Sequence, residues 1–426
     1  MPTSYDVVVV GAGINGCAAA AELALRGHKV VIVEKDDVAF EASGRNMGAI
    51  GILGKHASDL AGASIKKWDE AVNTLPEPFE YQRMGRVCPA YTPHDEMILH
   101  EMLSTARDHG GNIELLGTET VYDKFPELGP GISLAAYSAN DALLEPISAT
   151  RAFAALARER GVQFQTATLV SRVTSREGRV TGVELADGEL ITAKQVLLVA
   201  GVWTNRLLNK LNVRMPVQFA TIYHGETQPL DSAFDYFLRG PAFGARQLAD
   251  GVIRVTGGYE QLGAGHYLSF HDFRDLDLWA PRLWARRKEV QMRLDPRIMG
   301  YEMQAAWRNR PAPVGYEPTI PKNFPERKLA ELQKAMPSLA GARIVKKIAG
   351  AVDMTPDSLP IIGRVENYEG LFMAAGFNGQ GFGFGPVVGE LLAQQMSDEK
   401  LSIDLTPYRL ARFENRREIP MPARLV

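Results

Sequence analysis

Residues 7–16 have the sequence Val-Val-Val-Val-Gly-Ala-Gly-Ile-Asn-Gly, and residues 29–35 have the sequence Lys-Val-Val-Ile-Val-Glu-Lys. The order predicts a buried strand, a glycine turn, an alanine-rich helix and a second strand that ends in an acid. The glycines permit a tight turn, the approach of a pyrophosphate and close packing of helix and strand. Glu34 can accept the hydroxyls of a ribose, and the helix N-terminus attracts phosphates. This stretch therefore predicts a dinucleotide-binding site.

The composition is that of a globular protein with an ordinary surface. The 426 residues are 46% hydrophobic and 23% charged, enough for two domains and a large core. A net charge of −3 gives no reason to expect nucleic acid or an anionic membrane. The two cysteines exclude a disulfide scaffold, and no Cys/His cluster indicates a metal site. The low cysteine content and the lack of a basic signal-peptide start favour a cytoplasmic protein, and the apolar run from Val7 is interrupted by Asn15 and Glu22, so no transmembrane segment is expected.

The order of the elements predicts an α/β protein of two interleaved domains. A Rossmann-like dinucleotide-binding domain is expected in three pieces, 1–80, 141–215 and 340–396. An inserted α+β substrate or cap domain, built on a mixed or antiparallel sheet, is expected from 81–140 and 216–339, and 397–426 forms a C-terminal tail. Oligomer formation is compatible with this sequence.

A second glycine-rich turn indicates which dinucleotide is bound. Residues 353–363 are Asp-Met-Thr-Pro-Asp-Ser-Leu-Pro-Ile-Ile-Gly, and residues 376–386 are Gly-Phe-Asn-Gly-Gln-Gly-Phe-Gly-Phe-Gly-Pro. The second of these runs leads into a helix, whose N-terminus can hold partial negative charge on a ring carbonyl. This suits an isoalloxazine, because the reduced ring carries charge there.

These motifs resemble the flavoprotein amine oxidases of the D-amino acid oxidase superfamily, in the glycine oxidase and sarcosine oxidase branch. The resemblance covers most of the chain, but 258–330 matches poorly and looks elaborated. It implies FAD, extended between the two glycine turns. Carried over by position, it implies cofactor contacts from Gly11, Gly13, Ile14, Asn15, Gly16, Glu34, Lys35, Ser43, Gly44, Arg45, Asn46, Met47, Gly48, Val170, Ala200, Gly201, Trp203, Gly350, Gly376, Asn378, Gly379, Gln380 and Gly381.

The sequence departs from this family at the residues that hold the substrate. Members that oxidise amino acids clamp the substrate carboxylate with basic residues, but the corresponding positions here are Gly51, Val352 and Gly383. A carboxylate in a dry pocket needs a paired cation. Either the substrate lacks a carboxylate or another residue binds it. The residues nominated for the substrate side are Arg308, Arg310, His224 and Tyr259, with Asp353 as an alternative partner for a cationic amine.

Two further departures concern the flavin. Some relatives attach it covalently through a cysteine, whose position is Gly350 here, so non-covalent FAD is expected. A lysine over the flavin promotes reaction with oxygen in relatives, and the matching strand here offers Arg254, with a different hydrogen-bonding geometry. The electron acceptor therefore stays open between oxygen, a quinone and a partner subunit.

The predicted reaction is FAD-dependent oxidation of a C–N bond in a secondary amine or amino acid derivative. A hydride passes to flavin N5, and the imine is then hydrolysed. The alternatives are a dehydrogenase of a hydroxy acid or alcohol, the catalytic subunit of a multisubunit amine dehydrogenase, and a flavin-binding protein with a structural or sensing role.

Overall fold

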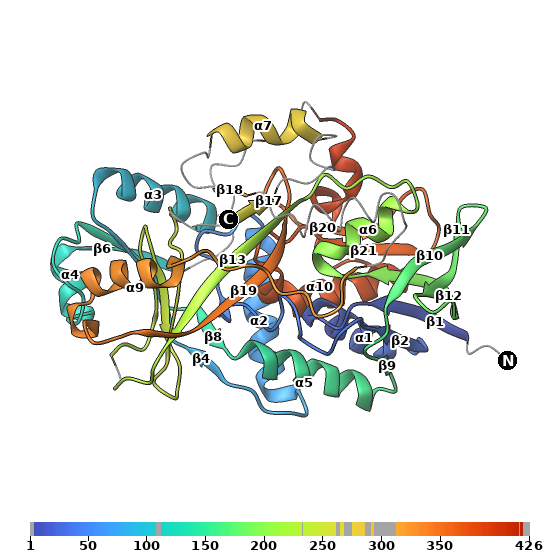
Figure 1. Ribbon diagram of the computed structural model, residues 1–426, viewed down its shortest axis with the longest axis horizontal. Helices are drawn as coiled ribbons and strands as arrows, with labels where there is room; N and C mark the ends of the chain where they lie inside the picture. The colour runs from blue at the N-terminus through green and yellow to red at the C-terminus, as the bar shows by residue number, and fades with distance from the viewer. Residues whose placement is uncertain are drawn as a thin grey trace.

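The computed structural model describes residues 4–107, 112–231, 233–260, 265–267, 275–285, 291–293, 312–416 and 418–420. Within these residues, two large sheets lie side by side, and long strands of the second run toward the first (Figure 1). No helix in the described part of the chain is both long and apolar enough to cross a membrane.

The first sheet has the parallel core that the opening motif predicts. Its parallel strands are β21 (Leu371–Ala375), β12 (Leu190–Leu198), β1 (Ser4–Val10), β2 (Val30–Val33) and β9 (Gln163–Gln165), in that order. The antiparallel strands β10 (Val170–Arg176), β11 (Arg179–Leu185) and β20 (Ile361–Arg364) extend it. Val7 and Val9 of β1 face one buried cluster, and Val8 and Val10 face another. Burial on both faces explains the unbroken valine run.

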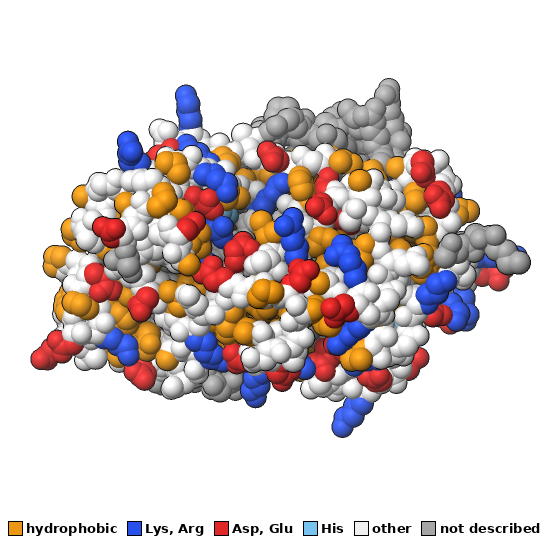
Figure 2. All heavy atoms as spheres, turned by 90° about the horizontal axis from the view of Figure 1, so that it is seen from below, with side chains coloured by type: hydrophobic (Ala, Val, Ile, Leu, Met, Phe, Trp, Pro, Cys, Tyr) orange, Lys and Arg blue, Asp and Glu red, His pale blue; other side chains and the backbone are white. Residues whose placement is uncertain are grey.

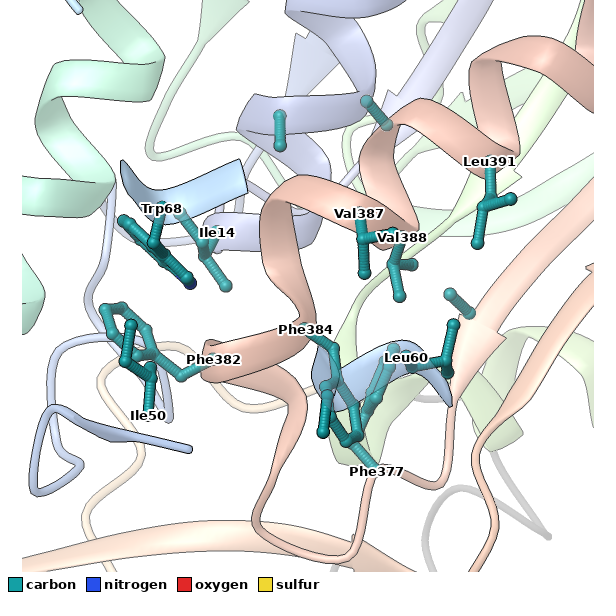
Figure 3. Close-up of a cluster of buried hydrophobic side chains, with 14 of the residues drawn as sticks. Ile14, Ile50, Leu60, Trp68, Phe377, Phe382, Phe384, Val387, Val388 and Leu391 are labelled. Atoms are coloured by element: carbon teal, nitrogen blue, oxygen red, sulfur yellow. The ribbon is translucent and has the colours of Figure 1, made fainter. Parts of the chain in front are cut away.

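Four helices cover one face of this sheet. They are α1 (Ile14–Leu25), α2 (Ser58–Thr74), α5 (Pro146–Glu159) and α10 (Gly381–Met396). Helix α10 packs against both α1 and α2. Figure 3 shows Phe382, Phe384 and Val387 of α10 in one cluster with Ile14 of α1 and Trp68 of α2. The N-terminus of α10 is thereby fixed next to the N-terminus of α1.

The second sheet is mostly antiparallel and carries its own core. Its strands are β18 (Gln291–Arg293), β17 (Gly265–Tyr267), β13 (Gln218–Thr227), β16 (Ile253–Thr256), β15 (Gly244–Gln247), β14 (Phe237–Arg239), β5 (Arg86–Ala90), β7 (Leu134–Ser138) and β6 (Ile113–Gly117), with β19 (Ile344–Met354) also paired to β13. Helices α3 (Pro93–Arg107), α4 (Thr118–Lys124) and α9 (Phe324–Ala335) lie beside it (Figure 1).

Smaller elements join the two sheets. A three-stranded sheet contains β3 (Ala49–Ile50), β8 (Ala142–Leu144) and β4 (Tyr81–Arg83). The 3-10 turn η1 (Gly201–Trp203) and helix α6 (Thr204–Asn209) follow β12, and α7 (Leu276–Ala285) precedes the last strands. The 3-10 turns η3 (Pro337–Leu339), η4 (Thr406–Tyr408) and η5 (Leu410–Phe413) complete the described elements. Acidic and basic side chains are interspersed over the face drawn in Figure 2.

One strand of the predicted dinucleotide-binding domain pairs with the second sheet. The strands of the first sheet fall inside the predicted pieces 1–80, 141–215 and 340–396. The third piece, however, begins with β19, which pairs with β13 along its length in the second sheet. A strand pattern read from sequence identifies the strand but not its partner, because pairing is decided by distant segments.

Candidate active site

A long pocket runs from the carboxyl end of β2, past both glycine turns, to the second sheet. This is the edge at which parallel sheets bind dinucleotides, since the strands end there and the helices begin. Many of the residues predicted to contact the cofactor line this pocket. They are Gly11, Gly13, Asn15, Glu34, Lys35, Ser43, Arg45, Asn46, Met47, Gly48, Val170, Ala200, Gly201, Trp203, Gly350, Gly379, Gln380 and Gly381.

The first glycine turn is built so that no side chain fits at two of its positions. Gly11 has a φ of +114°, and a Cβ there would lie 2.5 Å from the carbonyl oxygen of Val199. A Cβ on Gly16 would lie 2.0 Å from the carbonyl oxygen of Gly11. The hydroxyl of Ser43 accepts a hydrogen bond from the backbone N–H of Ile14, over 3.0 Å. The turn and the start of α1 are therefore held open toward the pocket.

The acid at the end of β2 is fixed by backbone donors. Glu34 accepts hydrogen bonds from the N–H of Ala12 (2.8 Å) and of Asp36 (2.9 Å). Burial nevertheless raises the pKa of the Glu34 carboxyl above its usual range. Beside it, Lys35 forms ion pairs with Asp36 and with Glu41, the latter at 2.6 Å. This end of the pocket thus presents ordered acidic oxygens, as recognition of ribose hydroxyls requires.

The second glycine turn is anchored by Asp353. Its carboxylate accepts hydrogen bonds from the N–H of Gly376 (2.5 Å) and of Phe377 (3.3 Å). Burial raises the pKa of this carboxyl. Asn378, at a φ of +54°, bonds to Thr355 and to the carbonyl of Gly376. Asp353 therefore shapes the turn. It also lines the pocket, so its role as a partner for a cationic amine stays a prediction.

Side chains of α1 and α2 fix the position of the N-terminus of α10. Trp68 donates a hydrogen bond from its indole nitrogen to the carbonyl of Gly383 at 2.8 Å, and its ring stacks on Phe382 at 5.5 Å between centroids. Asn15 donates to the carbonyl of Gly381 at 3.3 Å. The two helix N-termini therefore face one pocket, where their dipoles favour negative charge on a bound group.

These features fit FAD. The pocket joins a pyrophosphate-type glycine turn to a second helix N-terminus, and glycine backbone lines both places. Neither cysteine lines it, since Cys17 is buried in α1 and Cys88 in β5, so attachment of a flavin through cysteine has no candidate residue. A family described as "FAD dependent oxidoreductase" matches residues 6–395. The chain belongs to this family.

Known proteins of the family are similar over their whole length. Glycine oxidase from Pseudomonas putida is 24% identical, over 95% of this chain and 98% of its own. Monomeric sarcosine oxidase from Bacillus sp. is 26% identical, over 97% of each. The structure of L-amino acid deaminase from Proteus vulgaris superposes with a TM-score of 0.88 at 23% identity, covering 97% of this chain and 98% of that one. The fold prediction is confirmed, and the protein is an FAD-dependent oxidoreductase.

Five residues predicted to contact FAD do not line the pocket. Ile14 is buried against α10, and Gly16 and Gly44 pack against backbone carbonyls of Gly11 and Ala39. Gly376 and Asn378 shape the second turn from behind it. All of these residues hold the backbone that faces the pocket. A motif match cannot separate such supporting residues from contacting ones.

Arg254 does not face the flavin side of the pocket as predicted. Its Nε lies 2.8 Å from Glu226 Oε1, and Glu226 also pairs with Lys346 at 3.0 Å. Glu226 stands directly opposite Arg254 on the neighbouring strand, and cross-strand neighbours of opposite charge attract. Thr256, two residues further along β16, lines the pocket, whereas Arg254 does not. No contact of Arg254 supports its predicted role toward oxygen, which stays a prediction.

The other nominated residues have different outcomes. His224 lines the pocket, and burial together with the charge of Arg254 lowers its pKa to about 3, so the imidazole is neutral at physiological pH. Tyr259 does not line the pocket, and its hydroxyl donates to the carbonyl of Pro89 at 2.9 Å in the core. Arg308 and Arg310 lie outside the described residues.

The sequence reading missed a group of cations in the pocket, which we call the basic cluster: Lys55, Arg86 and Arg239. Lys55 follows β3, Arg86 begins β5 and Arg239 ends β14, so three distant segments contribute. Burial and the charges of the two arginines lower the pKa of Lys55 to about 7. In the sequence, Arg86 at the start of the otherwise apolar strand Arg86–Ala90 was the one sign of a buried cation.

The buried pair of Arg86 and Asp141 explains why Gly51 cannot be an arginine here. Arg86 is 2% exposed, and its Nε lies 2.8 Å from Asp141 Oδ2. A Cβ on Gly51 would lie 1.9 Å from that same oxygen. Gly51, Val352 and Gly383 all line the pocket, so cations there would face a substrate. The chain instead carries its pocket cations at other positions.

Proposed function

We propose that this protein oxidises the C–N bond of an amine that also carries a carboxylate, that is, an amino acid or an N-substituted amino acid. The observation that carries the proposal is the basic cluster at the pocket wall. Among the described residues the ammonium of Lys55 has no ion pair within 4.0 Å, and a half-buried cation in a pocket is stabilised when a ligand supplies the anion. The relatives named glycine oxidase and sarcosine oxidase act on substrates of this class, which supports it.

Each side of the pocket has its own part in the reaction. FAD, when bound, accepts the hydride from the carbon next to nitrogen. Lys55 and Arg239 hold the carboxylate, and Arg86, fixed by Asp141, adds positive potential behind it. This orients the C–H bond, which is the main contribution a protein makes to cofactor chemistry.

His224 has the properties of a neutral partner for the substrate nitrogen. Its imidazole carries no charge at physiological pH, because its pKa lies at about 3. It can therefore accept a hydrogen bond from the amine without repelling it. Hydride transfer needs a neutral amine, and cations placed at the carboxylate end favour loss of the ammonium proton.

An anaerobic reduction screen tests the proposal. The holoenzyme is mixed with glycine, sarcosine, L- and D-amino acids, matched amines without a carboxylate, and hydroxy acids, while the flavin absorbance is followed. We expect bleaching only by amines that carry a carboxylate. Bleaching by hydroxy acids alone would contradict the proposal and favour a dehydrogenase of hydroxy acids. Bleaching by simple amines alone would show that the basic cluster does not bind a substrate carboxylate.

The same samples identify the electron acceptor. Rapid reoxidation in air with formation of peroxide means an oxidase, and slow reoxidation means that a quinone or a partner protein takes the electrons. We propose the second outcome, because the strand cation expected near the flavin, Arg254, is bound by Glu226. A cytoplasmic location is proposed with it, since both cysteines are free and buried.

A further inference from the structure

A short segment of the elaborated stretch returns to the cofactor half of the molecule. We call residues Ala312–Glu317 the strap. The N–H of Gly315 donates a hydrogen bond to Asp36 Oδ1 at 2.7 Å. Arg45 donates from Nη1 to the carbonyl of Tyr316 at 2.9 Å. The strap is therefore tied on one side to the loops that follow β2.

The other side of the strap is held by aromatic packing. Tyr316 is 8% exposed, and its ring meets Trp203 edge-on at 5.3 Å and Phe219 edge-on at 5.9 Å. Trp203 and Phe219 are themselves 5.8 Å apart, and Ala351 of β19 joins the same buried cluster. Edge-to-face aromatic pairs stabilise beyond the area that they bury. The strap thus has a fixed position in the fold.

The partners of the strap are walls of the pocket. Arg45, Trp203 and Ala351 all line it, and so does Ala312 of the strap itself. Asp36 lies at the ribose end of the pocket, where its N–H donates to Glu34 and its carboxylate pairs with Lys35. The strap therefore connects the loops after β2 with η1 and β19 at the wall of the pocket.

From these contacts we propose that the strap is a part of the FAD site: Ala312 lines the pocket, and Tyr316, packed behind its wall, holds Trp203 in place. The first glycine turn would hold the pyrophosphate and the second the flavin ring, and the strap controls the release of FAD. A ring wedged between Trp203 and Phe219 must be displaced before the walls can separate. The proposal rests on membership of the FAD family and does not depend on the identity of the substrate.

Release of FAD on dilution tests this directly. Free FAD fluoresces more than bound FAD, so the fluorescence rise after dilution gives the dissociation rate. We expect Tyr316→Ala to release FAD at least tenfold faster, and Tyr316→Phe to stay within twofold, because the ring is kept. Val314→Ala is the matched control, since Val314 is 62% exposed in the same segment, and it should leave the rate unchanged.

Thermal unfolding separates a role in the FAD site from a role in the fold alone. A ligand that binds only the native state raises Tm by an amount set by its Kd. If Tyr316 supports the wall of the FAD site, the difference in Tm between holoenzyme and apoprotein becomes smaller in Tyr316→Ala. Equal losses of Tm in both forms, with an unchanged release rate, would overturn the proposal. If Tyr316→Ala is insoluble, Tyr316→Leu carries the same pair of measurements, with a release rate between those of the alanine and phenylalanine variants.

Discussion

The two ends of the pocket are built in different ways. At the ribose end, the residues that matter are neighbours in the chain: Gly11, Gly16 and Glu34 lie within one βαβ unit, held by backbone hydrogen bonds. At the other end, Lys55 and Arg239 come from segments that meet only in the folded protein. The cofactor end is therefore formed by residues close together in the sequence, whereas the substrate end is formed by segments that only the tertiary structure brings together.

The largest expected effect comes from the local end. Gly16→Ala places a Cβ 2.0 Å from a backbone oxygen, which only movement of the turn can relieve. We expect the purified variant to lack FAD, measured as the ratio of flavin to protein absorbance. Gly117→Ala is the control, because a Cβ there meets nothing within 4 Å. Retained stoichiometric FAD in Gly16→Ala would show that the turn tolerates the shift.

The second largest effect is expected at Lys55, where loss of substrate recognition can be separated from loss of stability. Lys55→Met should lower kcat/KM for a carboxylate-bearing amine by about a hundredfold, as expected for loss of a charged pair partner. The substitution should not destabilise the fold, because burial and the neighbouring positive charges both disfavour the charged form of Lys55 and lower its pKa. An equal or higher Tm is therefore expected by calorimetry. Lys66→Met, at an exposed position on α2, should change neither quantity.

The pH dependence of anion binding sharpens the same contrast. The pKa of Lys55 is lowered to about 7, so its charge is present below that pH and is lost as the pH rises through it. The Kd of a simple carboxylate such as acetate, read from the flavin spectrum, should stay level below pH 7. Above pH 7 the Kd should rise about tenfold for each pH unit, because binding of the anion is coupled to one proton on Lys55. Lys55→Met should abolish this slope, and a slope that survives would assign it to another group.

The smallest effect is expected at Arg254, which the sequence analysis places on the oxygen side of the flavin and which does not line the pocket. Arg254→Met removes a largely buried charged hydrogen bond to Glu226, which keeps Lys346 as a partner, and should cost about 2 kcal/mol of unfolding free energy. Neither the rate of anaerobic flavin reduction nor that of reoxidation in air should change by more than about twofold, because Arg254 lies outside the pocket wall. A large loss of the reoxidation rate would restore the predicted role of Arg254 toward oxygen.

By itself, the sequence determined the cofactor. The spacing of Gly11, Gly13 and Gly16 before a strand that ends in Glu34 is a local pattern typical of a dinucleotide site, and the second glycine turn together with the family resemblance indicated FAD. Tertiary structure alone decided the rest. It bound Arg254 to Glu226, gave Asp353 to the backbone of the second turn, and brought Lys55, Arg86 and Arg239 to one wall. These outcomes depend on strand pairing and burial between distant segments, which no local spacing encodes.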